Sequence, residues 1–317
     1  SLVIAPFAIL PLWAGMLLWL VFLTAWLYLA IVRSGLREKQ KIFILWFCGI
    51  TLPTALFMQQ FNIAVAAMIL SSFFLIEKEK DGWAAFFIVL GTFVKLYGIV
   101  GLAFFLFSRH KLRLLMWLTI WSVVLFCAPM LISSPSYVVG QYHEWFTCLV
   151  EKNAENLGSI QQNISLLGLV RRTTGCMNYS DLWLILPGMA LFALPYLRFS
   201  QYKNLAFRET ILASVLLFVI LFSTGSEASG YVIALLGVCI WYTAAPWKRG
   251  KWAIALMVFI FLLSGMGSSD IFPKFIREAY IKQYALRALP ISILWLWLCY
   301  ELCTKDYTPI EKADAHE

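Results

Sequence analysis

Lys95 occupies the position in this sequence that most needs a chemical explanation. It stands in "GTFVKLYGIVG", inside an otherwise uncharged run from Trp83 to Phe107. A charge inside a membrane segment is costly and is usually retained for a function, such as holding a phosphate oxygen. The alternatives are a lysine that snorkels to the membrane interface and one that a buried partner neutralises.

A second polar group interrupts the preceding apolar stretch. The turn "QQFN" contains Gln59, Gln60 and Asn62 and separates the apolar segments Ile42–Met58 and Ile63–Ile76. Irregular backbone at membrane depth is tolerated only where protein covers it or where it lines a wet cavity. We therefore expect this turn, Lys95 and Tyr97 to line one cavity, in which the ammonium group supplies charge and the amides supply directional hydrogen bonds.

The segment "NISLLGLVRR", Asn163 to Arg172, combines apolar positions with two terminal arginines. This pattern predicts a helix in the outer membrane interface. Arg171 and Arg172 are suited to phosphate oxygens, and the alternative is that they only anchor the helix to lipid headgroups.

Glu227 stands in the small-residue stretch "FSTGSEASGYV", Phe222 to Val232, between two apolar segments. Gly225 and Gly230 permit close approach of backbone to a ligand. We expect Glu227 to pair with Lys95 and to orient a sugar hydroxyl or an acceptor, without being the primary base. The alternative is a solvated loop acid.

The composition is that of a helical membrane protein. Of 317 residues, 62% are hydrophobic and 13% charged, whereas soluble domains carry about 25% charged residues. The net charge of +8 reflects basic loops beside membrane spans and does not indicate nucleic-acid binding. The seven cysteines and three histidines show no metal-ligand spacing, so neither a metal site nor a cofactor is expected.

Five basic clusters divide the apolar segments, and short basic loops face the cytoplasm. The clusters are Arg33–Lys41, Lys78 with Lys80, Arg109–Arg113, Arg198–Arg208 and Lys248–Lys251. All five share one side only if Trp83–Phe107 turns back at Lys95–Gly98 as two short helices. The other expected spans are Leu12–Val32, Leu114–Ile132, Leu182–Leu197, Ile211–Ser223, Tyr231–Ala245, Trp252–Gly267 and Ala285–Cys303.

We therefore predict an all-α fold, a polytopic transmembrane bundle of about 10 to 11 membrane helices with two short-helix hairpins. Residues 1–303 form one integral membrane domain, whose external loop 133–181 carries amphipathic helices, and residues 304–317 form a polar cytoplasmic tail. Pro273–Tyr284 is expected to be a further interfacial helix. Because the chain opens at Ser1, we also expect a preceding segment with at least one more span.

Several of these stretches resemble glycosyltransferase family 87. The core "QQFNIAVAAMILSSFFLIEKEKDGWAAFFIVLGTFVKLYG", the external stretch "QQNISLLGLVRR", the late "FSTGSEASGYV" and the opening "APFAILPLW" follow the order found in that family. The resemblance covers roughly residues 1 to 250. It implies a membrane glycosyltransferase of the GT-C architecture that uses a polyprenyl-phosphate-linked sugar.

The resemblance further implies inverting transfer of a mannose-like hexose or a pentose to a lipid or glycan acceptor. The reaction would take place on the external, periplasmic face of a bacterial inner membrane. The base of such enzymes is an acidic residue in the first external loop, which would precede Ser1, so we expect this chain to be inactive alone. With Glu227 as an accessory group, the donor site is expected to comprise Gln59, Gln60, Asn62, Lys95, Tyr97, Gln162, Asn163, Arg171, Arg172 and Ser226.

Two other classes of protein remain open. A secondary transporter also uses broken helices and intramembrane charges, but its sites lie near the midplane between repeated halves. Here the polar turns fall on one side, and no second copy of either hairpin is visible. A noncatalytic membrane scaffold is the third possibility.

Overall fold

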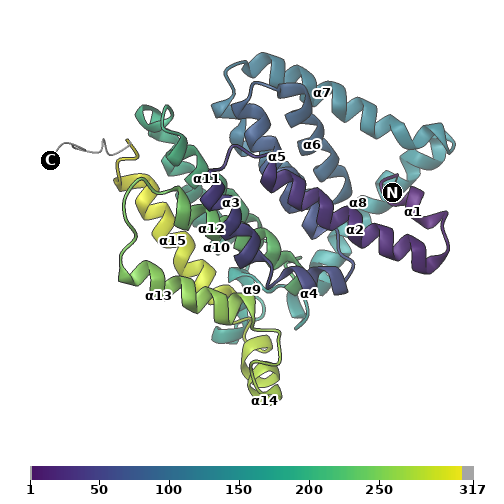
Figure 1. Ribbon diagram of the computed structural model, residues 1–317. Coiled ribbons are helices and arrows are strands. Elements are labelled where there is room, and N and C mark those ends of the chain that lie inside the picture. Colours follow the sequence, from purple (N-terminus) through teal and green to yellow (C-terminus); the bar gives the residue numbers. More distant parts are fainter. Residues whose placement is uncertain (1, 309–317) are drawn as a thin grey trace.

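The computed structural model describes residues 2–308 and contains helices and no strand within that range (Figure 1). In chain order the helices are α1 (Ala5–Ala8), α2 (Leu12–Val32), α3 (Glu38–Cys48), α4 (Leu52–Phe57), α5 (Asn62–Glu77), α6 (Asp81–Val94), the 3₁₀ helix η1 (Leu96–Phe107), α7 (Lys111–Cys127), η2 (Ala128–Leu131), α8 (Pro135–Gly158), α9 (Leu166–Thr174), α10 (Leu182–Ala193), η3 (Leu194–Leu197), η4 (Phe199–Gln201), α11 (Leu205–Leu221), η5 (Ala228–Gly230), α12 (Tyr231–Ala244), α13 (Lys251–Phe259), η6 (Ile260–Gly265), α14 (Lys274–Ile276), η7 (Arg277–Lys282) and α15 (Ala288–Thr304). The all-α prediction is confirmed.

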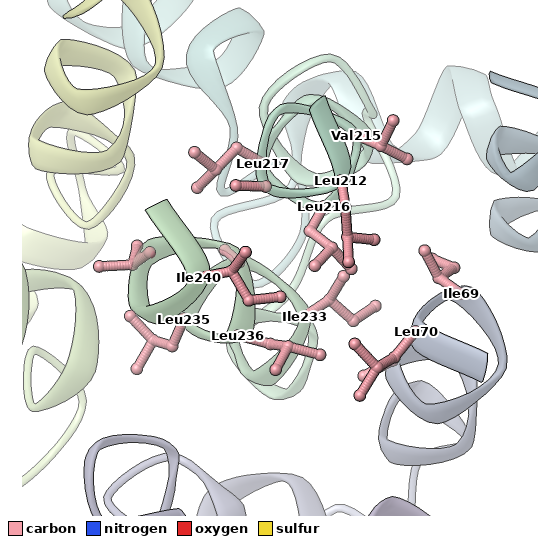
Figure 2. Packing of buried hydrophobic residues seen from close by; sticks show 14 of the residues in the cluster. Ile69, Leu70, Leu212, Val215, Leu216, Leu217, Ile233, Leu235, Leu236 and Ile240 are labelled. Carbon is pink, nitrogen blue, oxygen red and sulfur yellow. The ribbon is translucent and has the colours of Figure 1, made fainter. Parts of the chain in front are cut away.

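Helices α5, α11 and α12 form the centre of the bundle. Their residues are apolar on nearly all faces, the pattern of helices that other helices surround. Figure 2 shows Leu70 of α5, Leu216 of α11 and Leu236 of α12 among the buried side chains between them. Because the polar residues Asn62 and Glu227 lie at or next to the ends of α5 and α12, this rigid core fixes their positions.

The helix predicted to break at Lys95 does break there. Helix α6 ends at Val94, and Lys95 adopts an extended conformation (φ −152°, ψ 114°) before η1 begins. A Cβ atom at Gly98 would lie 2.3 Å from the backbone carbon of Gly91, so a glycine is needed for the two helices to pack this closely. The α6–η1 hairpin therefore presents Lys95 at its tip.

The other predicted hairpin is only partly correct. The segment Ile42–Met58 is not one helix, because it is interrupted between α3 and α4 around Gly49–Thr51. Only the short α4 packs beside α5, whereas α3 packs against α12. The turn at Gln59–Asn62 is nonetheless present, with Gln59 in the left-handed region (φ 52°).

Contacts join the basic clusters at one end of the bundle. Lys78 donates to the carbonyl of Arg33. Arg109 pairs with Glu79, and Arg208 pairs with Glu77. The clusters 33–41, 78–80, 109–113 and 198–208 are thus held together at the end of α5 opposite Asn62, as the predicted topology requires.

Two helical stretches have the length and composition to cross a membrane: Leu12–Val32 and Lys111–Leu131, the latter comprising α7 and η2. The other apolar helices of the described residues have 10–17 residues. At 1.5 Å per residue these reach roughly 15–25 Å, less than a hydrocarbon core of ~30 Å. The polytopic arrangement of 10 to 11 membrane helices stays a prediction.

The predicted external loop is more ordered than its sequence pattern suggested. It contains α8, a helix of 24 residues that begins where the Ser134 hydroxyl accepts from the Tyr137 amide. The amphipathic helix expected within 163–172 is present as α9, capped by Ser165. Pro273–Tyr284 forms the short α14 followed by η7, which project from the bundle in Figure 1.

Candidate active site

Lys95, Asn62 and Glu227 meet at the end of the bundle opposite the basic clusters. The Lys95 ammonium Nζ donates to Oδ1 of Asn62 at 2.8 Å and to Oε1 of Glu227 at 3.4 Å. Nδ2 of Asn62 donates to Glu227 at 3.3 Å and to the Ser229 hydroxyl at 2.8 Å. The predicted proximity of the three residues is confirmed, whereas their role in donor binding stays a prediction.

Burial makes this triad electrostatically significant. The Lys95 side chain is 25% exposed and the Glu227 side chain 8%, so the pair lies in a medium that screens charge less than water does. Asn62 bridges both charged groups and fixes their geometry. An ammonium group has three donors, and the contacts above use two of them, which leaves one for an incoming anion.

Tyr97 extends the cluster on the η1 side of the turn. The Lys95 ammonium group lies 5.1 Å from the centre of the Tyr97 ring, and the Tyr97 hydroxyl is 2.9 Å from that of Ser223. Gly225 lies beside this contact, and a Cβ there would be in ordinary contact, at 3.5 Å, with the Tyr97 oxygen. Tyr97 therefore connects the hairpin to the segment that carries Glu227.

The loop before α9 reaches the same cluster. Nε2 of Gln162 donates to Oε2 of Glu227 at 3.4 Å, and the Ile164 amide donates to the Ser226 carbonyl at 2.9 Å. Asn163 between them is buried and has a left-handed backbone conformation (φ 54°), and its Nδ2 has no hydrogen-bond partner among the described residues. Gln162 thus contacts Glu227 of the triad directly, whereas the buried side chain of Asn163 makes no hydrogen bond to the triad within residues 2–308.

The Ser226 side chain contacts the protein's own backbone. Its hydroxyl donates to the Ile220 carbonyl at 2.5 Å, and the residue is fully buried. Ser226 therefore fixes the course of the Glu227 segment and lacks the exposed hydroxyl that a donor contact requires.

Gln59 and Gln60 lie at the start of the turn that Asn62 ends. Trp19 donates its indole N–H to the Gln59 carbonyl at 3.3 Å, which holds the turn against α2. Within residues 2–308 the side-chain amides of both glutamines make no hydrogen bond, and neither residue is buried. These amides are free to contact a ligand.

Arg171 does not fit the predicted phosphate contact. Its guanidinium is buried, pairs with Asp181 at 2.9 Å, and also donates to the carbonyls of Met177 and Tyr179. Burial raises the pKa of Asp181, and the Arg171 charge opposes that rise. The donors of Arg171 are thus used to close its own loop.

Arg172 stabilises the loop that carries Gln162. It donates to the carbonyls of Ser159, Gln162 and Lys282. These contacts hold the loop that presents Gln162 and tie it to η7. Arg172 is therefore a positioning residue for Gln162, and not a direct neighbour of Lys95.

Two cavities are lined by residues next to Lys95 in the chain. The first has a volume of about 600 Å³ and a mostly apolar lining from α1, α6, α7, η2 and α8, including Phe93 and Val94 immediately before Lys95. The second, of about 410 Å³, is lined by residues that include Leu96 and Tyr97, immediately after Lys95. Lys95 itself lines neither cavity, and each is large enough for part of a substrate.

Residues 1–224 match glycosyltransferase family 87. The chain belongs to this family. The match includes the hairpin of Lys95, the turn of Asn62 and the loop of Gln162, and it ends just before Glu227. No curated protein and no solved structure matches the chain.

Membership of family 87 implies a glycosyltransferase, and the family is membrane-associated. A glycosyltransferase needs a group that binds the leaving group of its sugar donor. The triad offers a cation held in place by an amide and a carboxylate.

The sequence did not single out Asn153 and Asn156 of α8, which approach the Glu227 segment. Their spacing of one helical turn was the available signal.

Proposed function

We propose that this chain carries the donor-binding part of an enzyme that transfers a sugar from a polyprenyl-phosphate-linked donor to an acceptor on the external face of a membrane. The observation that carries the proposal is the contact of Lys95 with Asn62 and Glu227 at the tip of a hairpin whose neighbouring residues line two cavities. The sugar is a mannose-like hexose or a pentose, and the acceptor is a lipid or a glycan.

The charge of Lys95 supports a phosphate-linked donor. A phosphodiester carries one negative charge, and a charge-assisted hydrogen bond from the third Lys95 donor would hold one of its oxygens. Glu227 pairs with Lys95 and holds its ammonium group in place, and the amides of Gln59 and Gln60 can add neutral hydrogen bonds. A lipid monophosphate brings one negative charge to this site, fewer than a nucleotide diphosphate would bring.

The first cavity supports an isoprenoid chain on that phosphate. Its lining is mostly apolar, and it includes Phe93 and Val94, which directly precede Lys95 in the chain. A polyprenyl chain bound in the first cavity would place its phosphate at the Lys95 turn. The apolar chain and the charged phosphate would then each lie in a suitable environment. Membrane lipids would fill the first cavity in the absence of donor.

The surface supports a location within a membrane. Large apolar side chains remain exposed over many helices, including Trp46 at 80%, Trp183 at 79% and Trp252 at 72%. Exposed apolar area on this scale is typical of surfaces that contact lipid. Because the basic clusters gather at the opposite end from Lys95, short basic loops on the cytoplasmic side would place the triad on the external face. A bacterial inner membrane fits this arrangement.

The proposed chemistry is inverting transfer. The acceptor hydroxyl attacks the anomeric carbon, the carbon–oxygen bond to phosphate breaks, and polyprenyl phosphate leaves with the bonding electrons. A carboxylate base takes the hydroxyl proton, and phosphate leaves without strong acid assistance. Glu227 is assigned an accessory role: it orients a sugar hydroxyl or the acceptor while it holds Lys95.

The test uses the full-length protein, with any segment that precedes Ser1, in proteoliposomes supplied with undecaprenyl-phosphate-linked radiolabelled hexose. We expect label to reach a lipid or glycan, with transfer reduced at least about tenfold in Lys95→Met, the loss of roughly one charge-assisted contact. Lys248→Met, which removes an exposed lysine at the opposite end, is the matched control. Equal transfer by both variants, or transfer only from a nucleotide sugar, would refute the proposed donor.

A further inference from the structure

The second cavity differs in chemistry from the triad beside it. Its polar lining comes from Tyr97, Asn153, Ser223, Thr224 and Asp181, and its floor is apolar, with Ile185, Phe218 and Phe222. Neither Lys95 nor Glu227 lines it. Asp181 is already paired with Arg171. The cavity therefore offers neutral donors and acceptors over an apolar base, which suits an uncharged ligand.

Helix α8 contributes one residue, Asn153, to the lining of this cavity. Asn153 lines it and accepts from the Thr224 hydroxyl at 2.5 Å. One turn further along, Asn156 is 5% exposed, and its Oδ1 has no hydrogen-bond partner within the described residues. Its Nδ2 lies 3.8 Å from the position of a Cβ at Gly225, next to the Tyr97 hydroxyl. A buried amide oxygen without a partner is costly, but Asn156 does not line the second cavity, so Asn153 is the residue of α8 that a ligand there would contact.

The second cavity is distinct from the first cavity, in which the polyprenyl chain of the donor is proposed to bind. The first cavity is lined by α6 up to Val94, and the second by η1 from Leu96 onward. Lys95 stands between these two stretches in the chain and lines neither cavity, and Tyr97 of the second cavity has its ring centre 5.1 Å from the Lys95 ammonium group. A transferase needs a place for an acceptor hydroxyl on the side of the anomeric carbon away from the phosphate.

We propose that the second cavity binds the hydroxylated head group of an amphiphilic acceptor, such as a glycolipid. Asn153, Thr224 and Tyr97 bind its hydroxyl groups, and the floor at Ile185 and Phe218 takes the apolar part. Amides, hydroxyls and an aromatic ring are the groups that recognise neutral sugars by hydrogen bonds and stacking. This assignment rests on the proposed function, since it names the second substrate of that reaction.

The test measures two ligands separately on the protein in nanodiscs. Submicellar n-octyl β-glucoside probes the second cavity, and undecaprenyl phosphate probes the Lys95 site, each by its effect on the thermal unfolding midpoint. Asn153→Leu should weaken octyl glucoside binding about tenfold, as expected for one or two lost hydrogen bonds, and leave undecaprenyl phosphate within about twofold. Octanol, which lacks the sugar, should bind both proteins alike.

Asn178→Leu is the matched control, because Asn178 is exposed in the same loop and does not line the cavity. Thr224→Val, which removes one hydroxyl with little change of shape, replaces Asn153→Leu if the latter does not fold. Octyl glucoside binding equal to that of Asn178→Leu would overturn the acceptor site while leaving the donor proposal intact. If instead the proposed function is wrong, Lys95→Met should leave the binding of undecaprenyl phosphate unchanged.

Discussion

The ammonium group of Lys95 lies 2.8 Å from the side-chain oxygen of Asn62, a residue 33 positions earlier in the chain. The two residues belong to successive hairpins, and Glu227, 132 positions after Lys95, completes the contact. Three distant segments thus converge on one charge. A lysine that only snorkelled to the interface would have no need of this arrangement.

Lys95 and Glu227 should be energetically coupled. Removing one charge leaves the other partly buried and unpaired, so Lys95→Met and Glu227→Gln should each destabilise the protein by roughly 1–3 kcal/mol, less than for a fully buried pair. The double variant should be more stable than the sum of the two effects by about 1–2 kcal/mol. Thermal unfolding of the four proteins in detergent measures this cycle, and additive effects would show that the two charges do not interact.

Gly98 should be required for the hairpin. In Gly98→Ala the new methyl group would meet the backbone of Gly91 at 2.3 Å, so the α6–η1 packing must open. We expect a loss of about 2 kcal/mol or more in stability together with weaker undecaprenyl phosphate binding. Gly140→Ala in α8, where nothing lies within 4 Å, should be neutral or slightly stabilising. Similar unfolding midpoints for the two variants would argue against the close packing at Gly98.

Arg171 should matter for loop order and not for donor binding. In Arg171→Lys the planar contact with Asp181 and the carbonyls of Met177 and Tyr179 is lost, although the charge remains. Hydrogen exchange should accelerate across residues 175–181, with a stability loss of about 1–3 kcal/mol. Arg109→Lys, at an exposed pair, is the control and should have little effect. A selective loss of undecaprenyl phosphate binding in Arg171→Lys would instead restore its predicted phosphate role.

The external loop should be reachable from outside the cell. Cys148 and Cys176 are exposed on that loop, so a membrane-impermeant maleimide should label both in intact cells. A cysteine introduced as Gly250→Cys, in a background with Cys127, Cys148 and Cys176 replaced by serine, should react only after permeabilisation. Labelling of Cys148 and Gly250→Cys from the same side would contradict the proposed orientation.

The sequence predicted the triad because charge in an apolar run is a strong local signal. A lysine in an apolar run is expected only where other groups offset the cost of burying its charge. The small residues around Glu227 indicated a place where backbone and a ligand could approach closely. The span Leu12–Val32 was predicted with its observed bounds because its apolar run is long and uninterrupted.

Other features depend on tertiary contacts that periodicity does not report. The pairing of Arg171 with Asp181 requires a specific loop conformation, so an arginine at a helix end looked available for phosphate. Helix α8 was missed because its residues alternate in polarity without a long apolar run, although Ser134 and Pro135 form a recognisable helix start. The break between α3 and α4 follows Gly49 and precedes Pro53, a signal that the apolar pattern of Ile42–Met58 concealed.

The central claim is that Lys95 binds the phosphate of a lipid-linked donor, and direct binding of undecaprenyl phosphate tests it best. The affinity for nanodisc-embedded wild type, Lys95→Met and Lys248→Met should be measured by native mass spectrometry, with undecaprenol as the uncharged comparison. We predict that Lys95→Met loses about tenfold or more in affinity for undecaprenyl phosphate, while its affinity for undecaprenol and the affinities of Lys248→Met stay at the wild-type level. Equal affinity of Lys95→Met and wild type for undecaprenyl phosphate would contradict the claim.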